Sequence, residues 1–166
     1  MNPQWFGDSF DIVKRFFVEN LNEIGYHVVV DPMLTGEWDG LEHKFYEFLK
    51  AHPLNVKSNK KTALLLDPDT GVGIKKTKQH VTIKCIAEQL SKHDVVFSFD
   101  QSFSRGGNAT EKITEKLMLL KETGNYGFYY DSHARFLFAA KSIEILKEVE
   151  QQLLSSGLPA SRLFKA

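Results

Sequence analysis

Hydrophobic residues along the chain alternate between helical spacing and short continuous runs. Between Asp8 and Ile24 the apolar residues recur every three or four positions, which predicts a helix that Asp8 caps and Gly25 ends. The run from Tyr26 to Asp31 that follows is short and rich in valine, which is typical of a buried strand. A helix followed by such a strand is a building unit of α/β domains.

The same alternation continues to the end of the chain. It predicts helices from Asp39 to Leu49, over 83–90, after a capping box at Asn108 and Glu111, and over 142–155. Between them it predicts strands over 63–67 and 95–100 and a hairpin with strands 126–130 and 135–140. Right-handed crossovers place such helices on both faces of a mainly parallel sheet. We therefore expect residues 1–166 to form one three-layer, Rossmann-like α/β domain with about five strands and a C-terminal β-hairpin.

Composition and charge narrow the class of protein. The 21 basic and 21 acidic side chains cancel, which excludes a strongly basic nucleic-acid binder at the level of the whole chain and leaves local patches open. No apolar run approaches the roughly 20 residues of a membrane helix, and the first residues lack a signal-peptide pattern. The single cysteine, Cys85, suits a reducing compartment. We expect a cytoplasmic protein without membrane contact.

Three of the predicted strands end in an aspartate. These are Asp31, Asp67 and Asp100, and Asp69 follows two residues after Asp67. In open α/β sheets ligands bind beyond the carboxyl ends of the strands, so we expect the four acids to share a functional edge. The alternative is that each acid only starts a turn or caps the next helix.

Two segments carry a resemblance to a known family. The helix that opens with residues 7–14 and leads to the strand ending at Asp31 resembles the opening of ribosomal-RNA adenine methyltransferases and three-Cys-motif partner proteins. Residues 65–69 fall where that family has an Asp-Pro-Pro-Tyr-like motif. The resemblance covers most of the chain and implies a methyltransferase-related fold that acts on nucleic acid. It matches Asp67 and Pro68 to the catalytic-loop motif, and Lys14 and Asp31 to the cofactor side.

Three features differ from that family. The turn after Asp31 holds one glycine, Gly36, where the family uses several to let the backbone approach the cofactor. The interval between Gly36 and Ala63 has room for one helix and a loop, so the acid that would hold the cofactor ribose has no place. Asp69 stands at the second proline of the motif. These differences indicate a trimmed fold that has lost S-adenosylmethionine binding.

The turn from Asp67 to Gly71 also resembles the Asp-x-Asp motif of Toprim domains, which hold magnesium. Paired acids on one turn, joined by Asp31 or Asp100 from a neighbouring strand, can bind a hard cation that orients phosphate oxygens. We take Asp67, Asp69 and Asp31 as the hypothetical magnesium ligands. Phosphate affinity requires basic side chains, and six lysines flank this turn, although they also suit a solvated loop: Lys57, Lys60, Lys61, Lys75, Lys76 and Lys78.

The favoured hypothesis is a protein that acts on nucleic acid or on a nucleotide phosphate, as a metal-dependent phosphodiester or phosphate hydrolase. Its predicted catalytic residues are Asp31, Asp67, Asp69 and Asp100. Its predicted phosphate-binding residues are Lys14, Lys75, Lys76, His80 beside the Asp67 turn, and Arg105 in a glycine-containing turn before a helix.

Two other functions remain open from the residues alone. One is an S-adenosylmethionine-dependent nucleic-acid methyltransferase. The other is a non-catalytic protein-interaction module of phage or mobile-element origin, with Trp5, Phe6 and Trp38 as contacts to a protein partner.

Overall fold

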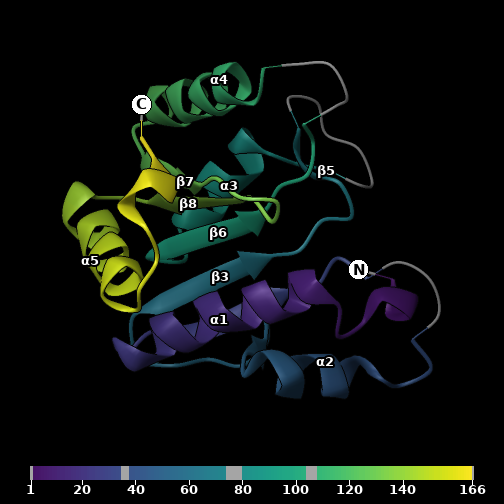
Figure 1. Ribbon diagram of the computed structural model, residues 1–166. Coiled ribbons are helices and arrows are strands. Elements are labelled where there is room, and N and C mark those ends of the chain that lie inside the picture. Colours follow the sequence, from purple (N-terminus) through teal and green to yellow (C-terminus); the bar gives the residue numbers. More distant parts are fainter. Residues whose placement is uncertain (1, 35–37, 74–79, 104–107, 166) are drawn as a thin grey trace.

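The structure, a computed structural model, describes residues 2–34, 38–73, 80–103 and 108–165. These residues form one mixed seven-stranded sheet, a separate two-stranded sheet and five α-helices, with helices on both sides of the large sheet (Figure 1). The helices are α1 (Ser9–Glu23), α2 (Glu42–Leu49), α3 (Ile83–Leu90), α4 (Ala109–Glu122) and α5 (Ile143–Ser155).

The large sheet has the strand order β2-β1-β3-β6-β8-β7-β9. Its first four strands run parallel to one another, and each following neighbour pairs antiparallel. The two strands β4 and β5 form the small parallel sheet. The strands are β1 (His27–Asp31), β2 (His52–Pro53), β3 (Thr62–Leu66), β4 (Gly71–Gly73), β5 (His80–Thr82), β6 (Val95–Phe99), β7 (Tyr126–Tyr130), β8 (Phe136–Ala140) and β9 (Leu163–Phe164).

The α/β class and the β7–β8 hairpin predicted from the sequence are confirmed, whereas a mainly parallel sheet of about five strands is not. The described part of the large sheet has seven strands because β2 and β9 contribute two residues each, too few to produce a periodic pattern. It is mixed because the hairpin inserts β8 between β6 and β7, so that β8 runs against both.

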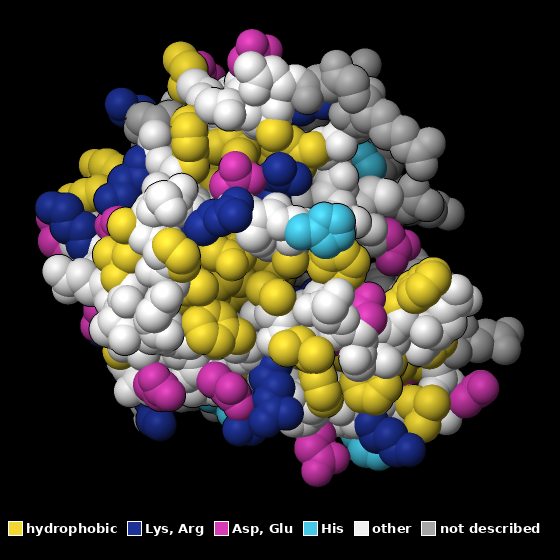
Figure 2. Space-filling model, viewed as in Figure 1, with side chains coloured by type: hydrophobic (Ala, Val, Ile, Leu, Met, Phe, Trp, Pro, Cys, Tyr) yellow, Lys and Arg dark blue, Asp and Glu magenta, His cyan; other side chains and the backbone are white. Residues whose placement is uncertain are grey.

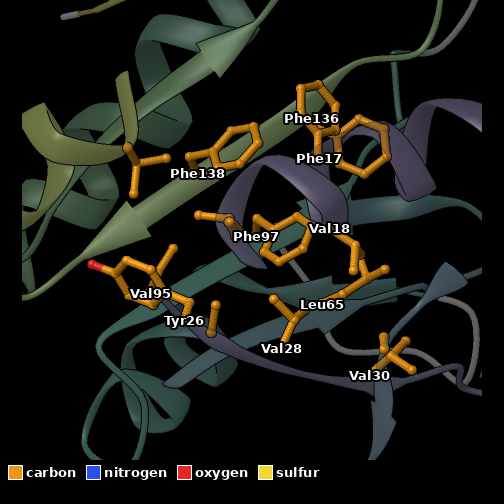
Figure 3. Packing of buried hydrophobic residues seen from close by; sticks show 14 of the residues in the cluster. Phe17, Val18, Tyr26, Val28, Val30, Leu65, Val95, Phe97, Phe136 and Phe138 are labelled. Atoms are coloured by element: carbon orange, nitrogen blue, oxygen red, sulfur yellow. The ribbon is translucent and has the colours of Figure 1, made fainter. Parts of the chain in front are cut away.

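Two hydrophobic clusters, one on each face of the sheet, hold the layers together. Helices α1, α2 and α5 pack on one face, and α3 and α4 pack on the other. Figure 3 shows Phe17 of α1 beside Phe136 and Phe138 of β8, and its ring centroid lies 4.9 Å and 5.0 Å from theirs. Phe97 of β6 stacks on Phe138 at 5.4 Å. Phenylalanines from helices and strands therefore fill one half of a three-layer core.

Helix caps follow the sequence at two of the three predicted positions. The carboxylate of Asp8 accepts from the backbone N–H groups of Phe10 and Asp11 and so begins α1, and Asn108 caps α4 in the same way. The predicted cap at Asp39 is wrong, because Asp39 has a φ of 47° and α2 begins only at Glu42.

The order of the parallel strands defines where a ligand would approach. From β1 the chain passes through α2 to the edge strand β2, and from β3 it passes through α3, on the opposite face, to β6. The direction of winding therefore changes between β1 and β3. Ligands of open α/β sheets bind at such a change, outside the carboxyl ends of the strands.

Candidate functional site

A pocket of about 320 Å³ lies at the carboxyl ends of β3 and β6, against the start of α1. Three aromatic side chains, Trp5, Phe10 and Phe99, form its walls. The other lining residues are mostly polar and come from the N-terminal segment and α1 (Asn2, Asp8, Asp11, Lys14), the turn after β3 (Asp67, Pro68, Asp69) and the residue that follows Asp100 (Gln101). We call it the β3–β6 pocket.

A buried ion cluster of three side chains lines this pocket. The Nζ atom of Lys14 lies 2.8 Å from Oδ1 of Asp11 and 2.9 Å from the carboxylate oxygens of Asp67. The three side chains are only 3%, 0% and 3% exposed, in the order Lys14, Asp11 and Asp67. Two carboxylates therefore share one ammonium, and the cluster carries one surplus negative charge when all three groups are ionised.

Local sequence explains why these groups meet. Asp11 and Lys14 are three residues apart on α1 and so lie on the same side of the helix. Asp67 is the first residue after β3, the strand that pairs with β6. The second oxygen of Asp11 accepts from the backbone N–H of Gly7 at 2.8 Å, and Lys14 Nζ lies 5.3 Å from the ring centroid of Phe99. Contacts with neighbouring residues therefore hold the side chains of Asp11 and Lys14 in place.

Burial and neighbouring charges change the pKa values of Asp67 and Lys14. Burial raises the pKa of Asp67, because the loss of hydration outweighs the attraction of Lys14. Burial disfavours the Lys14 ammonium, but the two carboxylates outweigh that effect and the pKa of Lys14 is raised. A carboxyl group with a raised pKa, in a pocket and beside a specific charged partner, is a candidate for binding or proton transfer.

Only two of the four predicted acids line the β3–β6 pocket. Asp69 is exposed and lines it together with Asp67. Asp31 is half-buried at the end of β1, is not among the lining residues, and its Oδ1 accepts from the backbone N–H of Met33 at 3.1 Å. For Asp31 the alternative of an acid that starts a turn therefore describes the geometry.

Asp100 is completely buried and links four parts of the chain through hydrogen bonds. Its Oδ1 accepts from the backbone N–H of Val72 at 3.0 Å and lies 2.7 Å from the Ser102 hydroxyl, and its Oδ2 accepts from Lys116 at 2.6 Å and from the Tyr129 hydroxyl at 2.7 Å. These donors come from β4, the loop after β6, α4 and β7. Because protein donors meet both of its oxygens, Asp100 fixes the loops around the site.

Burial also shifts the pKa values of Lys116 and Tyr129, two titratable side chains that donate to Asp100. Burial lowers the pKa of Lys116, and Asp100 offsets part of that change. Burial, and then the carboxylate of Asp100, raise the pKa of Tyr129 well above its usual value. Gly71 has a φ of 103°, and a Cβ at this position would lie 2.6 Å from the Cα of Asp100. The chain thus requires glycine where β4 passes the end of β6.

The predicted phosphate-binding residues do not form one group in the described residues. Lys14 is paired with Asp11 and Asp67, which commits its ammonium to carboxylates. His80 lies on β5, and its Nδ1 contacts the hydroxyl of Thr70, which follows Asp69. Lys75, Lys76 and Arg105 lie outside the described residues.

The lysine-rich segment before β3 lies away from the pocket. Lys61 precedes the first residue of β3 and Asp67 follows its last, so about 20 Å of strand separates them. Lys61 pairs there with Glu148 of α5 at 2.9 Å. Lys57 and Lys60 also precede β3, and Lys78 lies outside the described residues.

Magnesium binding by Asp67, Asp69 and Asp31 stays a prediction. Within the described ranges, no three His, Cys, Asp or Glu side chains are grouped as a metal ion would require. Asp31 turns toward its own loop and Asp67 toward Lys14, which accounts for this result.

Several lining residues were missed by sequence reasoning. Asp11 carried a usable signal, because it precedes Lys14 by one helical turn and so pairs with it. Phe10, Phe99 and Gln101 carried none, since hydrophobic spacing does not distinguish a pocket wall from the core. Trp5 was predicted as a partner contact, and it lines the β3–β6 pocket.

Comparisons with known protein families and with curated proteins find no match for this chain. Among the residues that the structure describes, none of the helices has the length and apolar character needed to cross a membrane. The fold and the site therefore define an α/β protein with an acidic, aromatic-walled pocket at the carboxyl ends of its parallel strands.

Proposed function

We propose that this protein acts on nucleic acid or nucleotides and that the β3–β6 pocket receives the base. The three aromatic walls support this proposal, because bases stack on such side chains. A pocket of about 320 Å³ is at the small end of ligand pockets, which suits a base and part of its sugar.

The surplus negative charge of the Asp11–Lys14–Asp67 cluster carries the proposal. An ionised carboxylate only accepts hydrogen bonds, so Asp67 favours N–H groups such as the amino group of a base. The same charge repels phosphate, and Lys14 is already paired. The base therefore enters the pocket and its phosphate stays at the mouth.

Asp67 is the residue for which we propose a chemical role. Its raised pKa brings it closer to neutral pH than an ordinary carboxyl group, where proton exchange with a substrate is more effective. Asp69, two residues further and exposed, would meet the ligand without entering the buried cluster.

A second candidate is magnesium-dependent chemistry on the phosphate. Mg²⁺ is commonly held by one or two carboxylates together with substrate phosphates, and Asp67 and Asp69 supply two carboxylates at one pocket. The excess of carboxylate over ammonium favours a cation there. In this version the ligand brings the remaining oxygen atoms.

The Rossmann-like, methyltransferase-related topology also stays a proposal. Four parallel strands with a change of winding between β1 and β3 support it. Against S-adenosylmethionine as cofactor stands the interval between Gly36 and Ala63. It contains the short strand β2, and the residues after β2 are Leu54 and Asn55 rather than an acid for the ribose.

Calorimetric titration tests these proposals together. The wild-type protein is titrated with each of the four ribonucleoside monophosphates, with and without Mg²⁺, with Mg²⁺ alone, and with S-adenosylmethionine. The variants are Asp67→Asn, Asp69→Asn and both together, and Glu47→Gln on the exposed side of α2 is the matched control. Because a hydrogen bond to a charged group contributes about 1.5–3 kcal/mol, Asp67→Asn should weaken nucleotide binding at least about tenfold.

The outcomes separate the candidates. Nucleotide binding without Mg²⁺ that Asp67→Asn weakens supports the base pocket. Binding that requires Mg²⁺ and is lost in the double variant supports the phosphate chemistry. Binding of S-adenosylmethionine would restore the methyltransferase hypothesis, and no binding of any ligand would favour the protein-interaction module.

A further inference from the structure

We propose that the natural ligand is a single-stranded nucleic acid, and that the strand leaves the β3–β6 pocket across Phe10 and His133 toward Arg135 and Arg162. This inference rests on the proposed function and goes beyond it, because it chooses a polymer over a free nucleotide. We call Phe10, His133, Arg135 and Arg162 the strand surface.

A row of three rings leads from the pocket to the surface of the protein. The ring of Phe10 lies 5.1 Å from that of Phe99, and both line the pocket. Phe10 also stacks on His133, with ring centroids 5.7 Å apart and planes inclined by 23°. His133 is exposed in the turn between β7 and β8. A base next to the one in the pocket can therefore continue this stack.

Trp5 provides a second exposed ring at the pocket. It lines the pocket wall, yet 58% of its surface is accessible to solvent. Exposed aromatic side chains that bases can stack on are the common feature of proteins that bind single strands. The pocket thus has a ring row on one side and an exposed indole in its wall.

The charges of the strand surface are opposite to those of the pocket. Nε of Arg135 pairs with Asp131 at 2.6 Å, and a terminal nitrogen of Arg162 donates to the backbone carbonyl of Asp131 at 3.2 Å. Two guanidinium groups and one carboxylate leave one positive charge at the turn beside His133. Figure 2 shows basic side chains together with an acidic one on one side of an exposed histidine, and further acidic side chains on the other. The surplus positive charge of this group suits a strand whose base faces the acids of the pocket while its phosphates pass over the arginines.

A duplex does not fit this arrangement. In a duplex the bases stack on each other and their amino groups are paired, so neither Asp67 nor the ring row reaches a base until it is unstacked. Only a single strand presents both its faces and its edges without that cost.

Fluorescence anisotropy with labelled oligonucleotides tests the inference on the full chain. The probes are mixed-sequence 12-nucleotide single strands of DNA and of RNA and the duplex of the same DNA sequence, and nucleoside monophosphates are measured as unlabelled competitors. We expect one of the single strands to bind at least about tenfold more tightly than the tightest monophosphate and than the duplex. Stacking of one base typically contributes about 1–3 kcal/mol, so His133→Ala should weaken oligonucleotide binding about fivefold or more and leave monophosphate binding unchanged.

Salt dependence tests the role of Arg162. Each phosphate contact to a single strand contributes about 0.7 to the slope of log K against log salt concentration, and Arg162→Gln should lower the slope by that amount. His43→Ala on α2 and Lys147→Gln on α5, both exposed, are the matched controls and should change neither quantity.

The failures of the two proposals are distinguishable. If the monophosphates bind in an Asp67-dependent way and the single strands bind no more tightly, the strand surface is refuted and the pocket stands. An effect of His133→Ala or Arg162→Gln no larger than that of the controls refutes it as well, as does duplex binding equal to that of the single strand. If no nucleotide binds at all, the proposed function itself is refuted.

Discussion

Replacing Lys14 by methionine removes the only ammonium from the described ion cluster and leaves Asp11 and Asp67 buried against each other. All three side chains are at most 3% exposed, so water does not replace the lost charge. To stay buried, a carboxyl group with an unfolded pKa near 3.9 must then bind a proton at pH 7, which costs about 4 kcal/mol. This agrees with the about 3–5 kcal/mol lost when one partner of a buried pair is removed. We expect Lys14→Met to lower the free energy of unfolding by that amount.

Urea denaturation followed by circular dichroism measures this loss at pH 7 and at pH 4.5. The loss should shrink at the lower pH, because protonation of the two carboxyl groups then costs little. The triple variant Asp11→Asn/Lys14→Met/Asp67→Asn should recover most of the stability, since it buries no unpaired charge. Lys147→Met on α5, where lysine is exposed, is the control and should change the stability by less than about 0.5 kcal/mol. A loss below about 1 kcal/mol for Lys14→Met at pH 7, or one independent of pH, would refute the buried cluster.

Three further predictions concern residues around the site and the base of the sheet. Asp100→Asn replaces a carboxylate that accepts from four parts of the chain, and it should cost about 3 kcal/mol or more in urea denaturation. Gly71→Ala adds a methyl group 2.6 Å from the backbone of Asp100 at a φ of 103°, and a thermal melt should show a loss of about 2 kcal/mol or more. Burial lowers the pKa of His93, whose Nδ1 has no hydrogen-bond partner among the described residues. The unfolded chain therefore binds a proton at His93 more readily than the folded protein, and stability should fall as the pH drops below about 6.5. His93→Gln should reduce this fall between pH 7.5 and 5.5. An equal fall in both proteins would contradict the assignment to His93.

Local signals explain which parts of the fold were predictable. Asp8 and Gly25 bracket α1 because a side-chain cap and a left-handed glycine are encoded by single residues. The start of α2 was not predictable in this way, because aspartate is a common N-cap residue but Asp39 has a left-handed backbone conformation. The position of β8 between β6 and β7 depends on pairing between distant segments, which hydrophobic spacing does not encode.

The candidate site was predictable in its location and only partly in its residues. The expectation that ligands approach the carboxyl ends of the strands agrees with the β3–β6 pocket, which Asp67 and Asp69 both line. Asp31 ends β1 and Asp100 follows β6, but Oδ1 of Asp31 accepts from the backbone of Met33, and protein donors meet both oxygens of Asp100. A sequence gives the position of an acid along a strand and not the donors that fold around it.

Calorimetric titration of the Asp67→Asn variant with the nucleoside monophosphate that binds the wild type most tightly tests the central claim. Because burial raises the pKa of Asp67, folding favours its protonated form, and the stability of that form is lost as the pH rises and the carboxyl group ionises. The asparagine side chain is uncharged like the protonated form, so the variant should fold at pH 7. We expect the folded variant to bind at least about tenfold more weakly than the wild type, while Glu47→Gln binds normally. Wild-type affinity in folded Asp67→Asn would contradict the assignment of this pocket to a nucleotide base.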